Sequence, residues 1–309
     1  AGYVGSKLTL DLAEKNHEVI IYDTCYFGKD HIKNDKNIKL IEGDIRDKIK
    51  FESAVNGCDT VIHLACISND PSFDLNEELS KSINFDCFED LVSISKKNGV
   101  KKFVYASSSS VYGFSDDPNV TEEHPLVPLT LYNKFKGMCE PVLKKYLDDK
   151  FRGVIIRPAT VCGYAPHCRL DLSVNILTNH AVNNKKIIVL GGGEQKRPNL
   201  HVNDMSRAYL ALMDNDFKDI NGETFNVSFE NKKIIELAKI VSNNVKNFFN
   251  YDNVEIEVKT ETVDNRSYHV NSDKIKKVLN FEPHYNIDDA VQSLCQAFKD
   301  GKLPDSLTD

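Results

Sequence analysis

Residues 60–65 (TVIHLA) form a nearly continuous apolar run about as long as one strand. Such runs are typical of parallel strands covered by helices on both faces, because neither face needs to be polar. Similar runs occur at Glu18–Tyr22, Phe103–Tyr105 and Gly153–Ile156, and helical patterns separate them. Repeated strand and helix units predict an α/β fold with a parallel sheet and right-handed crossovers.

The residues that follow these runs are the candidates for ligand binding. Ligands of open parallel sheets bind outside the carboxyl ends of the strands. Asp23, Asp44, Ala65 and Ser108 all fall at such an end. A chain of 309 residues is long enough to bury a sizeable core, in one large domain or two smaller ones.

The first residues, Ala1-Gly2-Tyr3-Val4-Gly5, precede a helical pattern, the strand Glu18–Tyr22 and then Asp23. Glycines, helix, strand and acid in this order are typical of the second half of a dinucleotide-binding unit. Gly2 and Gly5 would let the backbone approach a pyrophosphate at the helix N-terminus. Asp23 would bind the adenosine ribose and repel a 2′-phosphate, which predicts NAD rather than NADP. Since no strand precedes the glycines, we expect a truncated unit that lacks its first strand.

A serine run and a Tyr-Lys pair predict catalysis in combination, although each is weak alone. Tyr132 and Lys136 are four residues apart, so on a helix they share one face. The ammonium would then lower the pKa of the phenol from about 10 towards the range of a general base. Ser108, in the run Ser107–Ser110 after a buried strand, would hydrogen-bond the same substrate oxygen. This set predicts proton transfer at a sugar or alcohol hydroxyl while a cofactor takes the hydride.

Composition excludes several other classes. The net charge of −7 argues against binding of nucleic acid, because no basic face is evident. The eight cysteines are scattered without a C-x-x-C pair, so we predict no metal site. The sequence contains neither an apolar run of about 18 residues nor a signal peptide, so we expect no membrane span and a cytoplasmic location.

These motifs together resemble the extended short-chain dehydrogenases/reductases, of the NAD-dependent nucleotide-sugar epimerase/dehydratase type that includes UDP-glucose 4-epimerases. The resemblance extends through the serine run and Tyr132/Lys136 to Arg157-Pro158 and residues 197–204, RPNLHVND. It implies a Rossmann-type doubly wound parallel sheet in an NAD-binding domain at 1–163. A smaller α/β substrate-binding lobe would occupy 164–300, with some segments returning to the first domain. The tail 301–309 is expected to be disordered.

The resemblance also implies roles for individual residues. Tyr132 would be the catalytic base, Lys136 would orient it and bind the nicotinamide ribose, and Ser108 would be the hydroxyl helper. Arg197 would grip the sugar-nucleotide diphosphate bidentately, and Asp44 and Ile45 would flank the adenine. The complete set of expected NAD-binding residues is Gly2, Tyr3, Val4, Gly5, Asp23, Asp44, Ile45, Leu64, Ala65, Asn84, Ser107, Tyr132, Lys136 and Pro158. The expected substrate-binding residues are Ser109, Ser110, Thr160, Arg169, Asn175, Arg197 and Arg266.

The chain also departs from the family pattern. In the 4,6-dehydratases an Asp-Glu pair follows the helper residue, whereas Ser109 and Ser110 occupy those places here. Neither serine can act as a carboxylic acid, so dehydration is not expected, and the glutamate of the related decarboxylases is absent as well. Thr160 stands where many relatives have an asparagine that contacts the diphosphate.

We therefore expect an isomerase of carbohydrate biosynthesis that inverts a nucleoside-diphosphate sugar, most simply at C4, through a transient 4-keto intermediate. A nucleotide-4-keto-sugar reductase that consumes NADH, or a dehydratase of the same family, is the alternative. A non-catalytic dinucleotide sensor is a third interpretation, disfavoured by the intact triad. The resemblance further implies a homodimer through the long helices near Asp86 and Lys144. The sequence identifies neither the sugar nor the nucleotide base.

Overall fold

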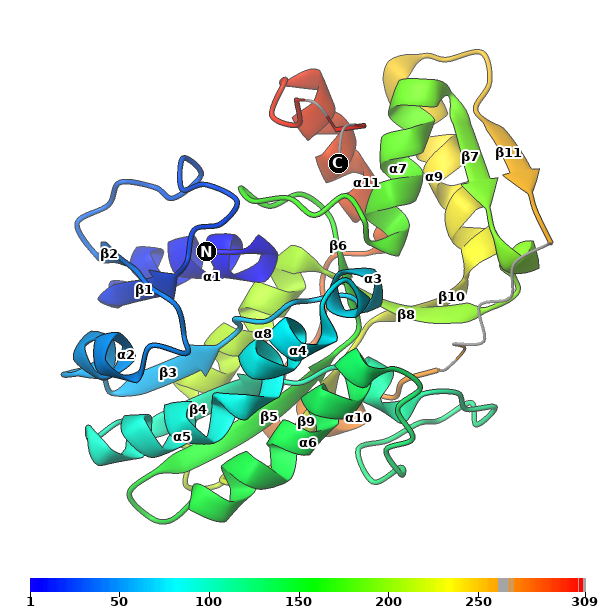
Figure 1. Ribbon diagram of the computed structural model, residues 1–309. Helices are drawn as coiled ribbons and strands as arrows, with labels where there is room; N and C mark the ends of the chain where they lie inside the picture. Colours follow the sequence, from blue (N-terminus) through cyan, green and yellow to red (C-terminus); the bar gives the residue numbers. More distant parts are fainter. Residues whose placement is uncertain (261–266, 268, 305, 308–309) are drawn as a thin grey trace.

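The largest sheet has four parallel strands in the order β3 (Thr60–His63), β4 (Lys102–Ala106), β5 (Arg152–Pro158) and β9 (Thr224–Val227). In its register Val104 lies between Ile62 and Val154. This computed structural model describes residues 1–260, 267, 269–304 and 306–307. The predicted parallel α/β architecture is confirmed (Figure 1).

Alternate residues of the central strands serve two separate cores, as the two-residue period of a strand requires. Phe103 and Tyr105 face the core formed with α5 (Phe88–Lys97) and α6 (Leu131–Tyr146). Val104 faces the opposite core, formed with α1 (Tyr3–Glu14) and α8 (Val202–Asp214). The sheet is therefore covered on both faces, which explains its continuous apolar runs.

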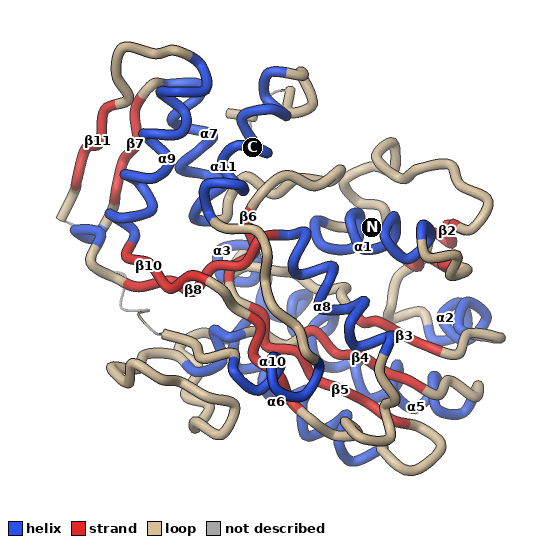
Figure 2. Tube along the Cα trace, turned by 180° about the vertical axis from the view of Figure 1, so that it is seen from behind, coloured by secondary structure: helices blue, strands red, loops and turns tan. Residues whose placement is uncertain are grey.

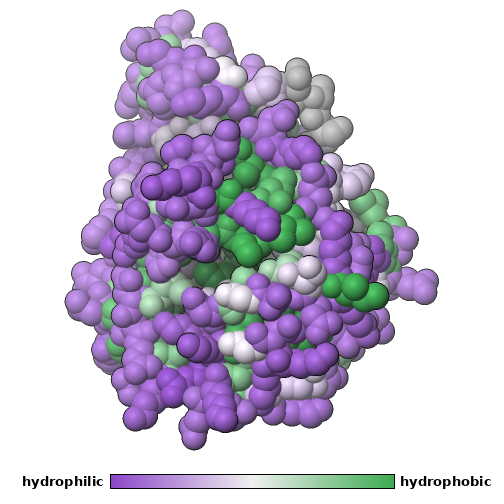
Figure 3. Space-filling model, turned by 90° about the vertical axis from the view of Figure 1, so that its left-hand side faces the viewer, coloured by the Kyte–Doolittle hydropathy of each residue, from purple (hydrophilic) through white to green (hydrophobic). Residues whose placement is uncertain are grey.

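A second parallel pair, β1 (Val19–Asp23) and β2 (Ile38–Glu42), lies beyond β3. Within the described residues, no ladder hydrogen bonds join this pair to the larger sheet. Ile20 of β1 is 38% exposed and Ile62 of β3 is only partly buried. On the side of the molecule where β1, β2 and α2 (Lys48–Val55) lie, Figure 3 shows apolar side chains gathered around a hollow with hydrophilic side chains around them.

The smaller lobe packs α7 and α9 against the parallel pair β7–β11, and α11 packs on these two helices. Its own apolar core includes Val174, Ile187 and Val241. Between this lobe and the large sheet run β6, β8 and β10, with β10 antiparallel to β8 and β6 parallel to it (Figure 2). The bounds are β6 Thr160–Cys162, α7 Ser173–Asn184, β7 Lys186–Val189, β8 Lys196–His201, β10 Glu230–Lys233, α9 Ile234–Phe249, β11 Glu255–Val258 and α11 Ile287–Lys299.

The chain passes between the large sheet and the small lobe more than once. After β6, α7, β7 and β8 it returns, because α8 packs on α1 and β9 pairs with β5. It then enters the lobe again through β10 and α9, and α10 (Asp273–Leu279) lies against β9. Both parts of the molecule are thus built from discontinuous segments.

The helical segment before β4 is interrupted. It consists of α4 (Glu77–Lys81), a π-helical turn at Ser82–Asp86, and α5. The short helix α3 (Asp70–Asp74) precedes it. Asn84 lies in the π-helical turn, where its Nδ2 donates to the carbonyl of Ile67 and its Oδ1 accepts from the Ile67 amide, both at 2.8 Å. The side-chain amide of Asn84 thus ties the π-helical turn to the backbone of Ile67. Turns of this kind inside helices are frequent at functional sites.

The expected disorder of the C-terminal tail is wrong for the part that the structure describes. Asn179 of α7 donates to the carbonyl oxygen of Ser306 at 2.6 Å, and Asn183 donates to the Ser306 hydroxyl at 3.2 Å. These two amides, one turn apart on α7, fix the tail to the small lobe.

Candidate active site

The turn that follows β4 carries the serine run. Ser107 continues the strand pairing, with its amide donating to the carbonyl of Ile156 at 2.8 Å. Ser108 then caps a short 3-10 helix, Ser109–Tyr112, which ends at Gly113 with φ +71°. A Cβ on Gly113 would lie 2.0 Å from the Val127 carbonyl oxygen, so only glycine fits this position. The serines are therefore held at the carboxyl edge of the sheet.

Helix α6 brings Tyr132 and Lys136 to the same edge. Its N-cap is Thr130, whose hydroxyl accepts from the Asn133 amide at 3.3 Å. Lys136 is only 4% exposed, and its Nζ donates to the carbonyl oxygen of Ala106, the last residue of β4, at 2.9 Å. Tyr132 is half-buried one turn earlier on the helix. The ammonium thus lies at the strand end from which Ser107 and Ser108 emerge.

A buried ion pair behind these groups fastens α6 to the sheet. Glu140, one turn after Lys136, accepts from Arg157 Nε at 2.9 Å and from Nη2 at 2.6 Å, and it also accepts from the Ser107 hydroxyl at 2.6 Å. Arg157 Nη1 donates to the Tyr112 hydroxyl at 2.8 Å. Burial raises the pKa of Tyr112 to about 12, so it stays neutral. Sequence reasoning missed Glu140, although its spacing from Lys136 places it on the same helix face.

The hydroxyls of Ser108 and Ser110 lie 2.6 Å apart. Ser110 Oγ donates in turn to Asn133 Oδ1, and its amide donates to Ser108 Oγ at 3.1 Å. Ser109 is 1% exposed and offers a substrate almost no surface, contrary to its predicted substrate contact. Asn133, beside Tyr132, is a second residue that sequence reasoning did not single out.

The N-terminus of α1 has the features of an anion site. In the described part of the chain no side chain caps it, and a Cβ on Gly2 would meet no atom within 4 Å. The first backbone amides of the helix are therefore open to a pyrophosphate. Tyr3 is 5% exposed, with its hydroxyl bonded to the Gly163 carbonyl, so it offers only its backbone; Val4 is half-buried and Gly5 is buried. Opposite the glycines, β1 ends at Asp23.

Asp23 is held in place by local contacts. One carboxylate oxygen accepts from the Cys25 amide at 2.8 Å, and the other lies 2.9 Å from the backbone nitrogen of Ala1. These residues fit an NAD molecule whose pyrophosphate lies on α1 and whose adenosine ribose lies at the end of β1.

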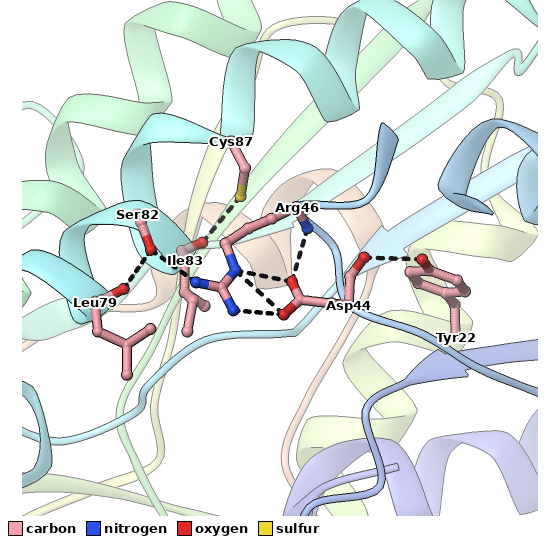
Figure 4. A network of polar contacts seen from close by, with 7 residues as sticks. All are labelled: Tyr22, Asp44, Arg46, Leu79, Ser82, Ile83 and Cys87. Carbon is pink, nitrogen blue, oxygen red and sulfur yellow. Dashed lines mark hydrogen bonds and ion pairs between the residues drawn. The ribbon is translucent and has the colours of Figure 1, made fainter. Parts of the chain in front are cut away.

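Asp44 lies where the adenine is expected, and its carboxylate is bound by Arg46 (Figure 4). Arg46 Nε donates to Oδ1 at 3.0 Å and Nη2 to Oδ2 at 2.6 Å, and this pairing lowers the pKa of Asp44. Arg46 also donates to the Ser82 hydroxyl at 3.2 Å, and Tyr22 donates to the Asp44 carbonyl at 2.8 Å. The adenine end is thus tied to the π-helical turn. Ile45 is 9% exposed.

The segment after β3 lies between the two ends of the expected cofactor site. Leu64 and Ala65 are half-buried, and Leu64 Cδ1 lies 3.6 Å from the position of a Cβ on Gly5. Asn84, expected near the diphosphate, engages the backbone of Ile67 with both polar atoms of its amide. The contacts in this structure assign Asn84 to holding this segment. Pro158 is half-buried at the end of β5.

The loop before α7 places Arg169 near the catalytic edge. Its Nε and Nη2 donate to Asp171 at 3.0 and 2.5 Å, and its Nη1 donates to the Ser68 hydroxyl at 2.8 Å. Burial disfavours the charge of Arg169, but pairing with Asp171 and the proximity of Tyr132 raise its pKa overall. Arg169 therefore bridges this loop and the segment after β3.

The other expected substrate-binding residues are differently placed. Asn175 is fully buried, and its amide binds the Gly163 amide, the Tyr3 hydroxyl and the Arg169 carbonyl, at 2.9, 3.2 and 2.8 Å. Asn175 therefore holds this loop in place, and contact with a substrate would require these three hydrogen bonds to break. Thr160 pairs with Asn199 in the β6–β8 ladder. Arg197 of β8 is 9% exposed. Arg266 lies outside the described residues.

This arrangement can remove a proton from a hydroxyl held between Tyr132 and Ser108 while the dinucleotide exchanges hydride with the carbon that bears it. In the described ranges, no helix is both long and apolar enough to cross a bilayer. No group of three or more His, Cys, Asp or Glu that could hold a metal ion is found in that same part of the chain.

Comparison with known proteins identifies relatives along the whole chain. Residues 1–228 match the NAD dependent epimerase/dehydratase family. The UDP-N-acetyl-alpha-D-glucosaminuronate decarboxylase of Bacillus cytotoxicus is 28% identical, over 97% of this chain and 96% of its own. The dTDP-D-glucose 4,6-dehydratase of Mus musculus is 30% identical, over 77% of this chain and 69% of its own. The UDP-glucose 4-epimerase of Thermotoga maritima, solved with UDP-glucose, superposes with a TM-score of 0.82 at 24% identity and 97% coverage of both chains.

Proposed function

Because this chain belongs to the NAD-dependent epimerase/dehydratase family, we propose that it is the epimerase among these activities, inverting C4 of a nucleoside-diphosphate sugar. The cofactor is NAD. One arrangement supports the proposal above all. Lys136 binds the last residue of β4, Ser108 follows that strand and Tyr132 lies one turn before Lys136, while serines stand at positions 109 and 110.

In the proposed reaction, Tyr132 removes the proton of the C4 hydroxyl. Lys136, held beside β4, favours the ionised phenol by its charge, and Ser108 hydrogen-bonds the same oxygen. NAD, when bound, supplies the chemistry of accepting hydride from C4 and returning it. Tyr132 then gives its proton back once the 4-keto sugar has presented its other face.

The binding residues follow from the same arrangement. NAD would lie across the amides of α1, Asp23 and Asp44, with Asn84 fixing the segment beneath it, and would reach Ser107, Lys136 and Pro158 at the nicotinamide end. Arg169 and Arg197 would bind the substrate diphosphate. Contacts to the nucleotide diphosphate hold the transient ketone, so remote binding energy serves the chemical step.

Elimination of water or loss of carbon dioxide is less well supported, although relatives bear the names of a dehydratase and a decarboxylase. Expulsion of water requires an acid and a base beside C5 and C6. Ser109 is buried and Ser110 is bonded to Ser108 and Asn133, and neither carries a carboxyl group. The residues at these two positions favour inversion.

We also propose which part of the chain binds each ligand and how two copies assemble. Residues 1–163 would bind NAD and 164–300 mainly the sugar nucleotide, with α8 and β9 belonging to the first part. The outer surfaces of α5 and α6, where Met138 is 38% exposed, would form a homodimer in the cytoplasm. Light scattering tests the dimer.

The deciding experiment is product analysis. The protein with NAD is incubated with a panel of UDP-, GDP- and dTDP-sugars, and products are examined by mass spectrometry and proton NMR. A product of unchanged mass with inverted C4 supports the proposal. A mass lower by one water or one carbon dioxide, or a reduced product formed with loss of added NADH, overturns it.

A further inference from the structure

We propose that Asn133, acting through Ser110, sets the direction of the hydroxyl hydrogen of Ser108 and so decides whether Ser108 accepts from or donates to the substrate oxygen. The inference rests on the proposed function, because it assigns Ser108 to that oxygen. Asn133 and Ser110 would be positioning residues, since they act through Ser108.

The three side chains form one continuous chain of hydrogen bonds. Ser108 Oγ and Ser110 Oγ are 2.6 Å apart, and Ser110 Oγ is bonded to Asn133 Oδ1. Asn133 is 1% exposed, and its Nδ2 is buried with no hydrogen-bond partner among the described residues. A buried amide nitrogen left without a hydrogen-bond partner destabilises the folded state. Such an exception calls for an explanation in this site.

Counting hydrogens fixes the direction of the chain. Each hydroxyl has one hydrogen to donate. When Ser110 donates to Asn133 Oδ1, the donor between the two serines must be Ser108. Ser108 also accepts from the Ser110 amide at 3.1 Å. In this state its only hydrogen is used inside the protein, and it meets a substrate only as an acceptor.

Turning the Asn133 amide by 180° reverses the chain with almost no change of shape, because oxygen and NH2 are nearly the same size. Nδ2 then donates to Ser110 Oγ, Ser110 donates to Ser108 Oγ, and the hydrogen of Ser108 is free for the substrate. The reversal gives the orphan nitrogen a partner and leaves the amide oxygen without one. Neither state satisfies the whole amide, so the two lie close in free energy.

The proposed reaction uses the donating state. A C4 hydroxyl whose only hydrogen goes to Tyr132 accepts from Ser108, and the C4 ketone can only accept. Ser108 must therefore donate while the ketone is present, as a donor aimed at a developing oxygen charge does. Reversal of this chain of hydrogen bonds at Asn133 supplies the donor while the ketone is present.

The test compares kcat and KM of Asn133→Asp, Asn133→Ala, Ser110→Ala and the double variant Asn133→Asp/Ser110→Ala at pH 8.5, with the sugar nucleotide of the panel that the wild type inverts. The ionised carboxylate that Asn133→Asp introduces only accepts, so it locks Ser110 and Ser108 in the non-donating direction. We expect kcat to fall about 100-fold with KM changed less than about threefold, which is the loss of one donor.

The remaining variants distinguish an effect of hydrogen-bond direction from an effect of altered side-chain packing. In Asn133→Ala, Ser108 is released from the locked state, and kcat should stay within about fivefold of the wild type. Ser110→Ala, at a predicted substrate-binding position, serves only as the reference for the double variant. The double variant should recover about tenfold over Asn133→Asp. Asn179→Asp, a change of a buried asparagine of α7 in the small lobe, is the control and should keep its activity.

Two results would overturn the inference: a double variant no more active than Asn133→Asp, or an Asn133→Ala variant as impaired as Asn133→Asp. If Asn133→Asp fails to fold, Asn133→Ala still tests the inference, because its kcat is expected to stay within about fivefold of the wild type. A loss of about 100-fold in Asn133→Ala would overturn the inference. Failure of the proposed function would show differently, as a wild type that inverts none of the sugars.

Discussion

Arg157 on β5 holds Glu140 on α6 through two hydrogen bonds of 2.9 and 2.6 Å, and the two side chains are only 7% and 5% exposed. Burial disfavours the charge of Arg157, but its bonds to Glu140 and Tyr112 raise its pKa overall. Because Glu140 follows Lys136 by one turn, this pair determines how the catalytic helix sits on the sheet.

Glu140→Gln should therefore destabilise the protein strongly. It leaves the guanidinium buried without a counter-charge, and breaking a buried pair in this way costs about 3–5 kcal/mol. Urea unfolding measures the loss. Glu52→Gln removes the exposed partner of Lys97 and should leave the unfolding midpoint nearly unchanged. Equal midpoints for the two variants would show that the buried pair does not hold α6.

Tyr132→Phe should lower kcat by about a thousandfold or more while NAD still binds, because the phenol supplies the proton transfer and the ring remains. Steady-state assay and NAD titration by calorimetry check both parts. Tyr146→Phe is the matched control on the same helix, since its hydroxyl donates to Glu89 at the surface, at 2.8 Å. A Tyr132→Phe enzyme with normal turnover would remove Tyr132 from the mechanism.

Asp23→Asn should weaken NAD binding about tenfold and strengthen NADP binding, because the amide no longer repels a 2′-phosphate and binds the ribose hydroxyls less well. Dissociation constants for both dinucleotides test this prediction. Asp30→Asn, in the exposed loop after β1, should change neither constant. Unchanged preference in Asp23→Asn would place the ribose elsewhere.

The free energy of unfolding should fall as the pH drops from about 6.5 to 4. Burial lowers the pKa of His201 to about 4, and its Nδ1 accepts from the Asn203 amide at 3.0 Å, so the folded state needs the neutral ring. The unfolded chain binds a proton near pH 6.5, which favours unfolding throughout this window by up to about 3 kcal/mol.

His201→Asn keeps an acceptor at the N-cap but does not titrate, so the slope of stability against pH should become shallower. Part of the slope will remain, since burial and the nearby Lys136 lower the pKa of His63 to about 3. His17→Asn, at an exposed position, is the control. An undiminished slope in His201→Asn would exclude His201 as the source.

The sheet could be predicted from the sequence because its strands are buried on both faces and carry continuous apolar runs. The runs locate β3, β4 and β5, and parallel pairing then brings the strand ends to one edge. That edge contains Ser108, two residues after β4, whereas Asp23 ends β1 of the separate β1–β2 pair. Both inferences needed only local patterns and one rule of topology.

Side-chain partners could not be predicted in the same way. Asn175 binds Tyr3, 172 residues away, and Asn84 binds Ile67 across a π-helical turn. Such pairs depend on how distant segments meet, which no periodicity records. An asparagine at the edge of a site therefore suggests a ligand contact from sequence alone, whereas these two amides are used within the protein.

The returning path of the chain has a consequence for dissection of the protein. A fragment covering 164–300 would carry α8 and β9 away from α1 and β5 and would expose the apolar surfaces of both. Neither half can be produced as an independent folding unit by cutting the gene at one point. Insertions or fusions that keep both halves working should be placed at exposed turns within a lobe, because each crossing segment joins elements of both halves.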